Sequence, residues 1–159
     1  MTVKADMLKL LNSTQFPKNT GRTNNLKPGQ TFSLSMVLGK VRMFYGKGLA
    51  ESRFNKKHPE LLAMAKKLLK SHDPKYGFQA VTINKNHASA RHTDKYNRGH
   101  SYIIGLGNYT GGELVFEEGD YKGVHNIKNR WLKFKGDTPH YVKPFKGTRY
   151  TLVYYHWVK

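Results

Sequence analysis

Two histidines and one aspartate have the residue types and spacing of a metal site. His92 and Asp94 are separated by one residue, and His140 follows Asp94 by 46 positions. Side chains two apart on an extended strand point the same way, so one strand end can supply two ligands and a second strand the third. Two imidazoles and one carboxylate occupy one face of an octahedral Fe(II) and leave three positions for a bidentate cosubstrate and dioxygen. This spacing predicts an oxygenase site.

A second feature is a cation in the last apolar stretch of the chain. Arg149 is followed closely by Leu152 and Val153, and a buried guanidinium is costly unless it pairs with an anion. A dicarboxylate such as 2-oxoglutarate would supply that anion. Thr151 shares the face of Arg149 and can hydrogen-bond the same carboxylate. Asn84, on the strand that leads to His92, is expected to bond the metal-proximal carboxylate of the cosubstrate or to cap a strand end.

The His-x-Asp pattern is weak when it is taken alone. The chain has eight histidines, so chance pairs are expected, and the competing interpretation is a set of solvated surface residues. The metal site is favoured by the conjunction of the motif with His140 after Pro139 and with the Arg149 strand. A motif counts only in a fitting structural context, and that context has to come from the elements around it.

The first half of the chain is expected to support the site. Helices are expected at 1–12 and at 59–71, the second with an apolar stripe that packs against a sheet as a buttress. Residues 13–30 are expected to form a basic, mobile loop. Residues 32–45 alternate well enough for one or two strands, broken near Gly39.

From Phe78 onward the pattern changes to short strands separated by turn residues, which is typical of a β-sandwich or barrel. Glycines at 111–112 and 119 mark hairpin or bulge positions. We therefore expect one domain over 1–159, with N-terminal helical support in 1–77 and a mainly β catalytic core in 78–157. The strands of that core are expected at 78–84, 101–106, 113–117, 124–128, 131–135, 139–143 and 148–157.

The charge of the chain indicates its partner. There are 28 Lys and Arg against 10 Asp and Glu, a formal net charge of +18, well beyond the roughly 2–8 that solubility requires of a small domain. A merely solubilising surface or an anionic membrane is less favoured than nucleic acid, with DNA as the expected substrate. Arg91, Lys95 and Arg98 flank the predicted metal site, where they contact a phosphate backbone or remain solvated loop charges.

Other classes of protein are excluded by composition. The chain has no cysteine, which rules out disulfides, zinc-thiolate clusters and thiol catalysis. The apolar patch between Met7 and Leu11 is too short for a signal peptide, and no later run approaches membrane-spanning length. We expect a soluble intracellular monomer, in the cytoplasm of a microbe or virus-infected host or in a nucleus.

Three segments resemble a known superfamily when they are taken together. They are His-Thr-Asp-Lys-Tyr-Asn at 92–97, Tyr-Thr-Gly-Gly-Glu-Leu at 109–114 and Arg-Tyr-Thr-Leu-Val-Tyr-Tyr at 149–155. They are similar to the Fe(II)/2-oxoglutarate-dependent dioxygenases, and most of all to the ten-eleven-translocation and J-binding-protein branch. The resemblance implies a double-stranded β-helix (jelly-roll) fold, Fe(II) and 2-oxoglutarate as cofactor and cosubstrate, and oxidation of the 5-methyl group of pyrimidines in nucleic acid.

The resemblance also implies which residues hold an extruded base. Asn97 would contact it, Tyr155 would stack on it, and His156 or Trp157 would lie at its edge. Chemistry on a base methyl requires the base to leave the stack, which needs an aromatic platform and an amide of these types. The alternatives are structural: Asn97 precedes Arg98-Gly99 and suits a turn, and Tyr155 suits core packing.

Two departures from the family keep the substrate open. The chain lacks the cysteine-rich region of the animal members, and its interval from His140 to Arg149 is tighter, which favours a compact viral or microbial form. That interval and the Gly-Gly-Glu-Leu segment also resemble prolyl hydroxylases. Three functions remain: a hydroxylase of 5-methylcytosine or thymine, a peptidyl hydroxylase, and a non-catalytic basic nucleic-acid-binding jelly roll. His87, His100 and His125 are expected to be surface or structural residues.

Overall fold

The computed structural model describes residues 2–43 and 48–158, so the expected strand end at 44–45 lies outside the described residues. Two helices and three strands precede the main helix, and strands dominate the rest of the chain. The elements are α1 (Val3–Asn12), β1 (Lys18–Asn19), β2 (Ser33–Arg42), β3 (Leu49–Glu51), α2 (Phe54–Lys57), α3 (Pro59–Lys70), β4 (Ala80–Lys85), β5 (Asn97–Gly111), β6 (Leu114–Phe116), β7 (Gly123–His125), β8 (Leu132–Phe134), β9 (His140–Val142) and β10 (Phe145–Trp157).

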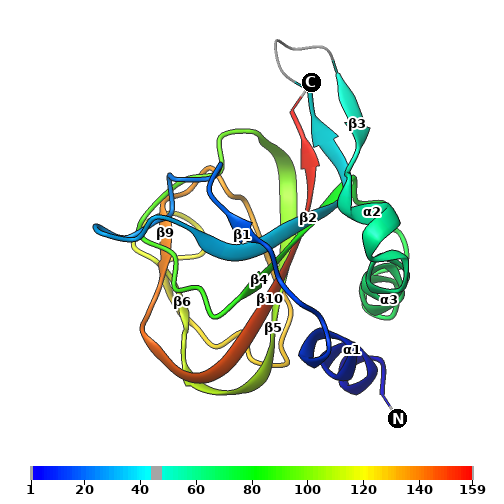
Figure 1. Cartoon of the computed structure of the whole chain (residues 1–159). Coiled ribbons are helices and arrows are strands. Elements are labelled where there is room, and N and C mark those ends of the chain that lie inside the picture. The colour runs from blue at the N-terminus through cyan, green and yellow to red at the C-terminus, as the bar shows by residue number, and fades with distance from the viewer. Residues whose placement is uncertain (1, 44–47, 159) are drawn as a thin grey trace.

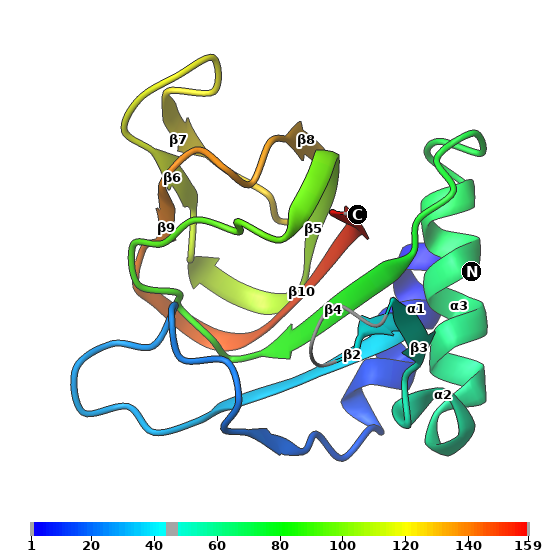
Figure 2. The same ribbon diagram turned by 90° about the horizontal axis from the view of Figure 1, so that it is seen from above.

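The strands form two sheets. The seven-stranded sheet has the order β1-β2-β4-β10-β5-β8 with β3 paired to β2, and the three-stranded sheet has the order β7-β6-β9. The small sheet faces one side of the large sheet, and the helices cover the other side (Figures 1 and 2). This arrangement confirms the prediction of a mainly β, double-stranded β-helix fold with N-terminal helical support.

The helices are held to the large sheet by one apolar stripe each. Pro59 begins α3, as expected of a residue without a backbone donor. Thr2 caps α1 by accepting a hydrogen bond from the Ala5 amide at 3.1 Å. No helix in the described ranges is long and apolar enough to cross a membrane. The buried helix residues are Met7, Leu11, Leu61, Ala65, Leu68 and Leu69, and they pack on Met36, Leu38, Val81, Ile83, Leu152 and Tyr154 of the sheet.

The central strand β10 uses its two faces differently. Tyr150, Leu152 and Tyr154 are buried in the core beneath the helices, while the residues between them face the space between the two sheets. This alternation follows from the period of two in an extended strand. A second, smaller core closes that space with Ile103, Leu114, Phe116, Ile127, Phe134 and Val142.

Several elements differ from expectation in the first half of the chain. β2 is not broken at Gly39 but runs through it with a φ of +94°, where a Cβ would lie 2.5 Å from the Gln79 carbonyl oxygen. The expected loop at 13–30 contains β1, whose residues Lys18 and Asn19 pair with β2. β2 itself pairs with β4, so residues before 78 supply strands of the large sheet as well as helices.

Candidate active site

Between the two sheets lies a cavity of about 630 Å³. Its wall from β10 is formed by alternate residues: Arg149, Thr151, Val153, Tyr155 and Trp157. β4 adds Thr82 and Asn84, and the register of the two strands places Asn84 opposite Thr151. All three residues of the predicted metal site also line this cavity.

Backbone pairing brings His92, Asp94 and His140 together. His92 and His140 form an isolated antiparallel bridge, in which each amide donates to the other's carbonyl at 3.0 Å. The Asp94 amide donates to the Gly136 carbonyl at 2.8 Å. The His-x-Asp segment is expected at the end of a strand, but it lies in a loop outside the named strands. Two backbone pairings hold this loop against Gly136 and against His140, the first residue of β9.

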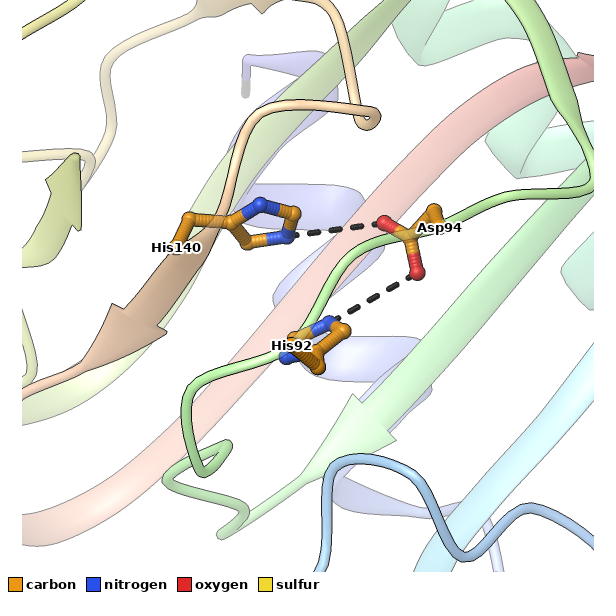
Figure 3. A group of neighbouring side chains, drawn as sticks. All are labelled: His92, Asp94 and His140. Atoms are coloured by element: carbon orange, nitrogen blue, oxygen red, sulfur yellow. Dashed lines mark ion pairs between the residues drawn. The ribbon is translucent and has the colours of Figure 1, made fainter. Parts of the chain in front are cut away.

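The side-chain geometry of this triad suits a metal ion. The Asp94 Oδ1 lies 3.6 Å from His92 Nε2, and Asp94 Oδ2 lies 3.5 Å from His140 Nε2, with both rings directed at the carboxylate (Figure 3). The two Nδ1 atoms lie 2.7 Å from the carbonyls of Ala90 and Thr138. An Nδ1–H donated to a carbonyl leaves the Nε2 lone pair free for a metal, and the possible ligand atoms all lie within 4.8 Å of one another.

The electrostatics keep Asp94 and His92 in their metal-binding forms. Burial by itself raises the pKa of Asp94, but the close approach of His140 and the positive charge of Arg22 outweigh it and lower the pKa to about 2. Burial lowers the pKa of His92 below its usual value of 6.5. A carboxylate and a neutral imidazole are the forms that ligate Fe(II).

Arg22 is a site residue that the sequence analysis missed. Its guanidinium lies 2.8 Å from Asp94 Oδ1, and its loop is tied to the motif by two further contacts. Asn24 Nδ2 donates to the Thr93 carbonyl at 3.2 Å, and the Ala90 amide donates to the Asn25 carbonyl at 2.9 Å. Residues 21–25 all line the cavity. The sequence signals only a basic loop here, because the contact spans 72 residues.

Arg149 is one of the most deeply buried side chains, at 2% exposure. Its NH1 donates to the His87 carbonyl at 3.0 Å and its NH2 to the Gly112 carbonyl at 2.9 Å, while Nε has no partner. Gly112 has a φ of +69°, and a Cβ there would lie 2.6 Å from Arg149 Nε. The second glycine of the Gly-Gly-Glu-Leu segment is therefore required so that the backbone can approach the guanidinium.

The remaining polar groups beside Arg149 are suited to an anion. Asn84 Nδ2 donates to Thr151 Oγ1 at 3.1 Å, which leaves the Thr151 hydroxyl proton available to a ligand. Asn84 lies inside β4 and does not cap it. Five buried side-chain atoms of the described residues lack a hydrogen-bond partner, and three of them belong to residues that line the cavity: Asn25, His87 and Arg149. Buried polar groups are rarely left unpaired. The Arg149 and His87 nitrogens can donate to an anion such as 2-oxoglutarate, whereas Asn25 Oδ1 is an acceptor and needs a donor instead.

Three of the residues expected at a base line the same cavity: Asn97, Tyr155 and Trp157. Asn97 opens β5 opposite Trp157, and both line the cavity. Tyr155 also lines it but is only 5% exposed, with its hydroxyl 3.0 Å from Thr82 Oγ1. The rings of Tyr155 and Trp157 meet edge to face, with centroids 5.0 Å apart. Tyr155 thus combines a packing role with a place in the cavity wall.

His156 requires a correction, because it does not line the cavity. Its Nε2 hydrogen-bonds the Gly77 carbonyl, and its ring packs on Tyr76 at 4.9 Å between centroids. The physical reason is strand parity: successive side chains point to opposite faces, so the position next to Tyr155 faces away. Trp157, two residues after Tyr155, occupies the cavity side instead.

The three residues expected to contact phosphate differ in their positions relative to the cavity. Lys95 lines the cavity, and its ammonium lies 5.0 Å from the centroid of the exposed Tyr96 ring. Arg91 and Arg98 are exposed and do not line it. Arg91 lies 3.6 Å from Glu117, and Arg98 pairs with the His156 position of β10.

Comparisons with known proteins agree with this fold. No family model matches the sequence, and no curated protein matches it significantly. The solved structure of NgTET1 in complex with 5mC DNA aligns with 98% of this chain and 67% of that chain, at a TM-score of 0.62 and 16% identity. An oxidoreductase of the 2OG-Fe(II) oxygenase family from Burkholderia pseudomallei aligns with 95% of this chain and 76% of its own, at a TM-score of 0.57 and 18% identity.

At these identities the similarity shows the fold, and the triad shows the type of site. The double-stranded β-helix, the His92-Asp94-His140 cluster and the buried Arg149 meet in one cavity. The chain therefore has the fold of the Fe(II)- and 2-oxoglutarate-dependent dioxygenases and carries the His-Asp-His facial triad of such a site, as the sequence predicted.

Proposed function

We propose that this protein is an Fe(II)- and 2-oxoglutarate-dependent dioxygenase that hydroxylates the 5-methyl group of a pyrimidine, 5-methylcytosine or thymine, in DNA. The observation that carries the proposal is the shared cavity. The triad, the Arg149–Thr151 pair and the Asn97–Trp157 pair all open into it. This shared lining supports a proposal in which a metal, an anionic cosubstrate and a flat substrate bind next to one another.

Each group of residues in the cavity would bind a different component of the reaction. His92, Asp94 and His140 would hold Fe(II), and Arg149 with Thr151 would hold the distal carboxylate of 2-oxoglutarate. When bound, iron, 2-oxoglutarate and dioxygen supply the oxidation that puts one oxygen atom into a C–H bond, with succinate and carbon dioxide as the other products. The protein supplies orientation in a buried cavity, which favours reaction of a correctly placed methyl group.

The nucleic-acid substrate is supported by charge and by the cavity wall. The net charge of +18 attracts a polyanion, and NgTET1, which shares the fold, was solved with 5mC DNA. Asn97 would read the edge of an extruded pyrimidine, while Tyr155 and Trp157 would provide its aromatic surface. Lys95 would contact the flanking phosphate, and the exposed Arg91 and Arg98 would add to the attraction of the backbone.

The test is mass spectrometry of nucleosides after incubation of the protein with DNA, Fe(II), 2-oxoglutarate and dioxygen. One duplex carries 5-methylcytosine, and a second of the same sequence carries only thymine as a methylated pyrimidine. We expect a 5-hydroxymethyl nucleoside from at least one of them and none with Asp94→Ala. Succinate release without any oxidised nucleoside would refute the DNA substrate. Release stimulated by a proline-rich peptide would favour a peptidyl hydroxylase instead.

A further inference from the structure

His87 is the one cavity-lining histidine that the metal site does not use. It is 3% exposed, and its Nε2 has no hydrogen-bond partner. An unpaired polar atom in a buried position is unusual in a native structure, and a missing ligand is one of its explanations. The sequence predicts a surface or structural role for His87, and its burial excludes the surface role.

The hydrogen bonds around His87 fix which of its ring nitrogens carries the proton. The Lys27 amide donates to Gln30 Oε1 at 3.1 Å, which identifies the amide nitrogen of Gln30 as the donor on the other side. Gln30 Nε2 lies 3.0 Å from the Phe32 carbonyl and 3.4 Å from His87 Nδ1. His87 Nδ1 therefore accepts, and the proton of the neutral ring is on Nε2.

The ring is neutral as well as buried. Burial, together with the nearby cations Arg22 and Arg149, lowers the pKa of His87 to about 4. The unpaired Nε2 is thus an N–H donor of a neutral imidazole, and only an acceptor can satisfy it. The cations around it make an anionic acceptor favourable.

The backbone clamps this residue to Arg149. The Asn86 amide donates to the Arg149 carbonyl at 2.7 Å, and the Arg149 amide donates to Asn86 Oδ1 at 2.8 Å. Arg149 NH1 completes the clamp through the His87 carbonyl at 3.0 Å. Asn86 has a φ of +51°, so the turn that presents His87 is held in a specific backbone conformation. The guanidinium and the imidazole are consequently fixed parts of one cavity wall.

We propose that His87 Nε2–H is a further donor to the distal carboxylate of 2-oxoglutarate, beside Arg149 and Thr151. The inference rests on the proposed function, since it assigns a residue to the cosubstrate of that reaction. His87 acts as a binding residue that selects a 2-oxo acid with a second carboxylate. A 2-oxo acid without that carboxylate, such as pyruvate, makes no use of it.

The experiment compares the binding of 2-oxoglutarate and pyruvate to the Zn(II)-loaded protein by isothermal titration calorimetry, so that no turnover is involved. His87→Phe keeps the ring volume and removes the donor, while His87→Gln keeps an N–H near the same position. We expect His87→Phe to raise the Kd for 2-oxoglutarate about tenfold to a hundredfold, the range for a hydrogen bond to a charged group. The Kd for pyruvate should not change, and His87→Gln should recover part of the loss.

A second measurement needs no variant. In the unaltered Zn(II)-loaded protein, the His87 Hε2 proton should shift in the NMR spectrum on addition of 2-oxoglutarate and not on addition of pyruvate. An unchanged 2-oxoglutarate Kd in His87→Phe, or an equal loss of both ligands, would overturn the assignment. If the unaltered protein binds Zn(II) but neither ligand, the proposed function itself is overturned together with it.

Discussion

The two faces of β10 differ in what satisfies their polar atoms. On the helix side, the Tyr150 hydroxyl donates to Asn12 Oδ1 at 3.0 Å and the Tyr154 hydroxyl to the Ala65 carbonyl at 2.7 Å. On the cavity side, Arg149 Nε has no partner although it is buried. A face that is complete within the protein serves stability, and a face that leaves buried donors unpaired is arranged for a ligand.

Neighbouring residues of β10 lie on opposite faces and therefore have different roles. Leu152 is fully buried beneath the helices, while Thr151 beside it faces the cavity. Because the period of a strand is two, substitutions at adjacent positions should have different consequences. The helix-side changes should alter the free energy of unfolding, and the cavity-side changes should alter binding and turnover.

The largest effect is expected for Asp94→Ala. Loss of the carboxylate removes one of the three metal ligands, so succinate formation should fall to background. The fold should persist because the backbone pairings of residues 92–94 do not depend on this side chain. Succinate release and circular dichroism measure the two outcomes, and turnover at the original rate would contradict the metal assignment.

Leu152→Ala should separate stability from binding. Removal of a fully buried leucine side chain costs about 2–5 kcal/mol of unfolding free energy, depending on how far the cavity relaxes. The Kd for 2-oxoglutarate should not change under conditions in which the variant is folded. Urea denaturation and calorimetry test both statements, and a selective loss of 2-oxoglutarate binding would contradict the division between the faces.

Arg149→Lys should have the opposite effect: it should weaken the binding of 2-oxoglutarate more than it lowers the free energy of unfolding. The ammonium keeps the charge but loses the fork that donates to two backbone carbonyls and that would also bond the proposed carboxylate. We expect the Kd for 2-oxoglutarate to rise roughly tenfold to a hundredfold. A Kd equal to that of the unaltered protein would mean that another cation binds the cosubstrate.

A smaller effect is expected from pH on the cavity face. Because the pKa of His87 is lowered to about 4 in the folded protein, the unfolded chain binds more protons between pH 6.5 and 4. Stability from this residue is therefore complete above pH 6.5 and is lost as the pH falls. Compared with His87→Gln, the unaltered protein should lose on the order of 1–3 kcal/mol over this range. Urea denaturation at several pH values tests this, and a pH-independent difference would contradict it.

The sequence predicted most of the features that repeat along a strand or a helix. Strand periodicity placed Arg149 and Thr151 on one face, and the apolar stripe of 59–71 predicted the buttressing helix, as the structure shows. The same parity rule explains why His156 is not in the cavity. Its expected role came from the family resemblance, which left the choice between the neighbouring residues His156 and Trp157 open, and a shift of one residue reverses the face.

Features that depend on long-range contacts could not be predicted from the sequence. Arg22 meets Asp94 across 72 residues, and Gln30 meets His87 across 57. Neither contact leaves a local pattern in the sequence. Arg22 and Gln30 lie in the loop between β1 and β2, and the path of this loop is set by the pairing of these two strands. The polar lining supplied by residues 21–25 and the contact of Gln30 with His87 therefore become visible only when the chain is folded.

The most direct test of the central claim is anaerobic calorimetric titration of Fe(II) and then 2-oxoglutarate into the unaltered protein and Asp94→Ala. The account predicts one Fe(II) per chain at the triad, followed by one 2-oxoglutarate whose binding requires the metal. Asp94→Ala should lose both. Failure of the unaltered protein to bind Fe(II), or retention of stoichiometric Fe(II) binding in Asp94→Ala, would contradict the assignment of His92, Asp94 and His140 as the metal site.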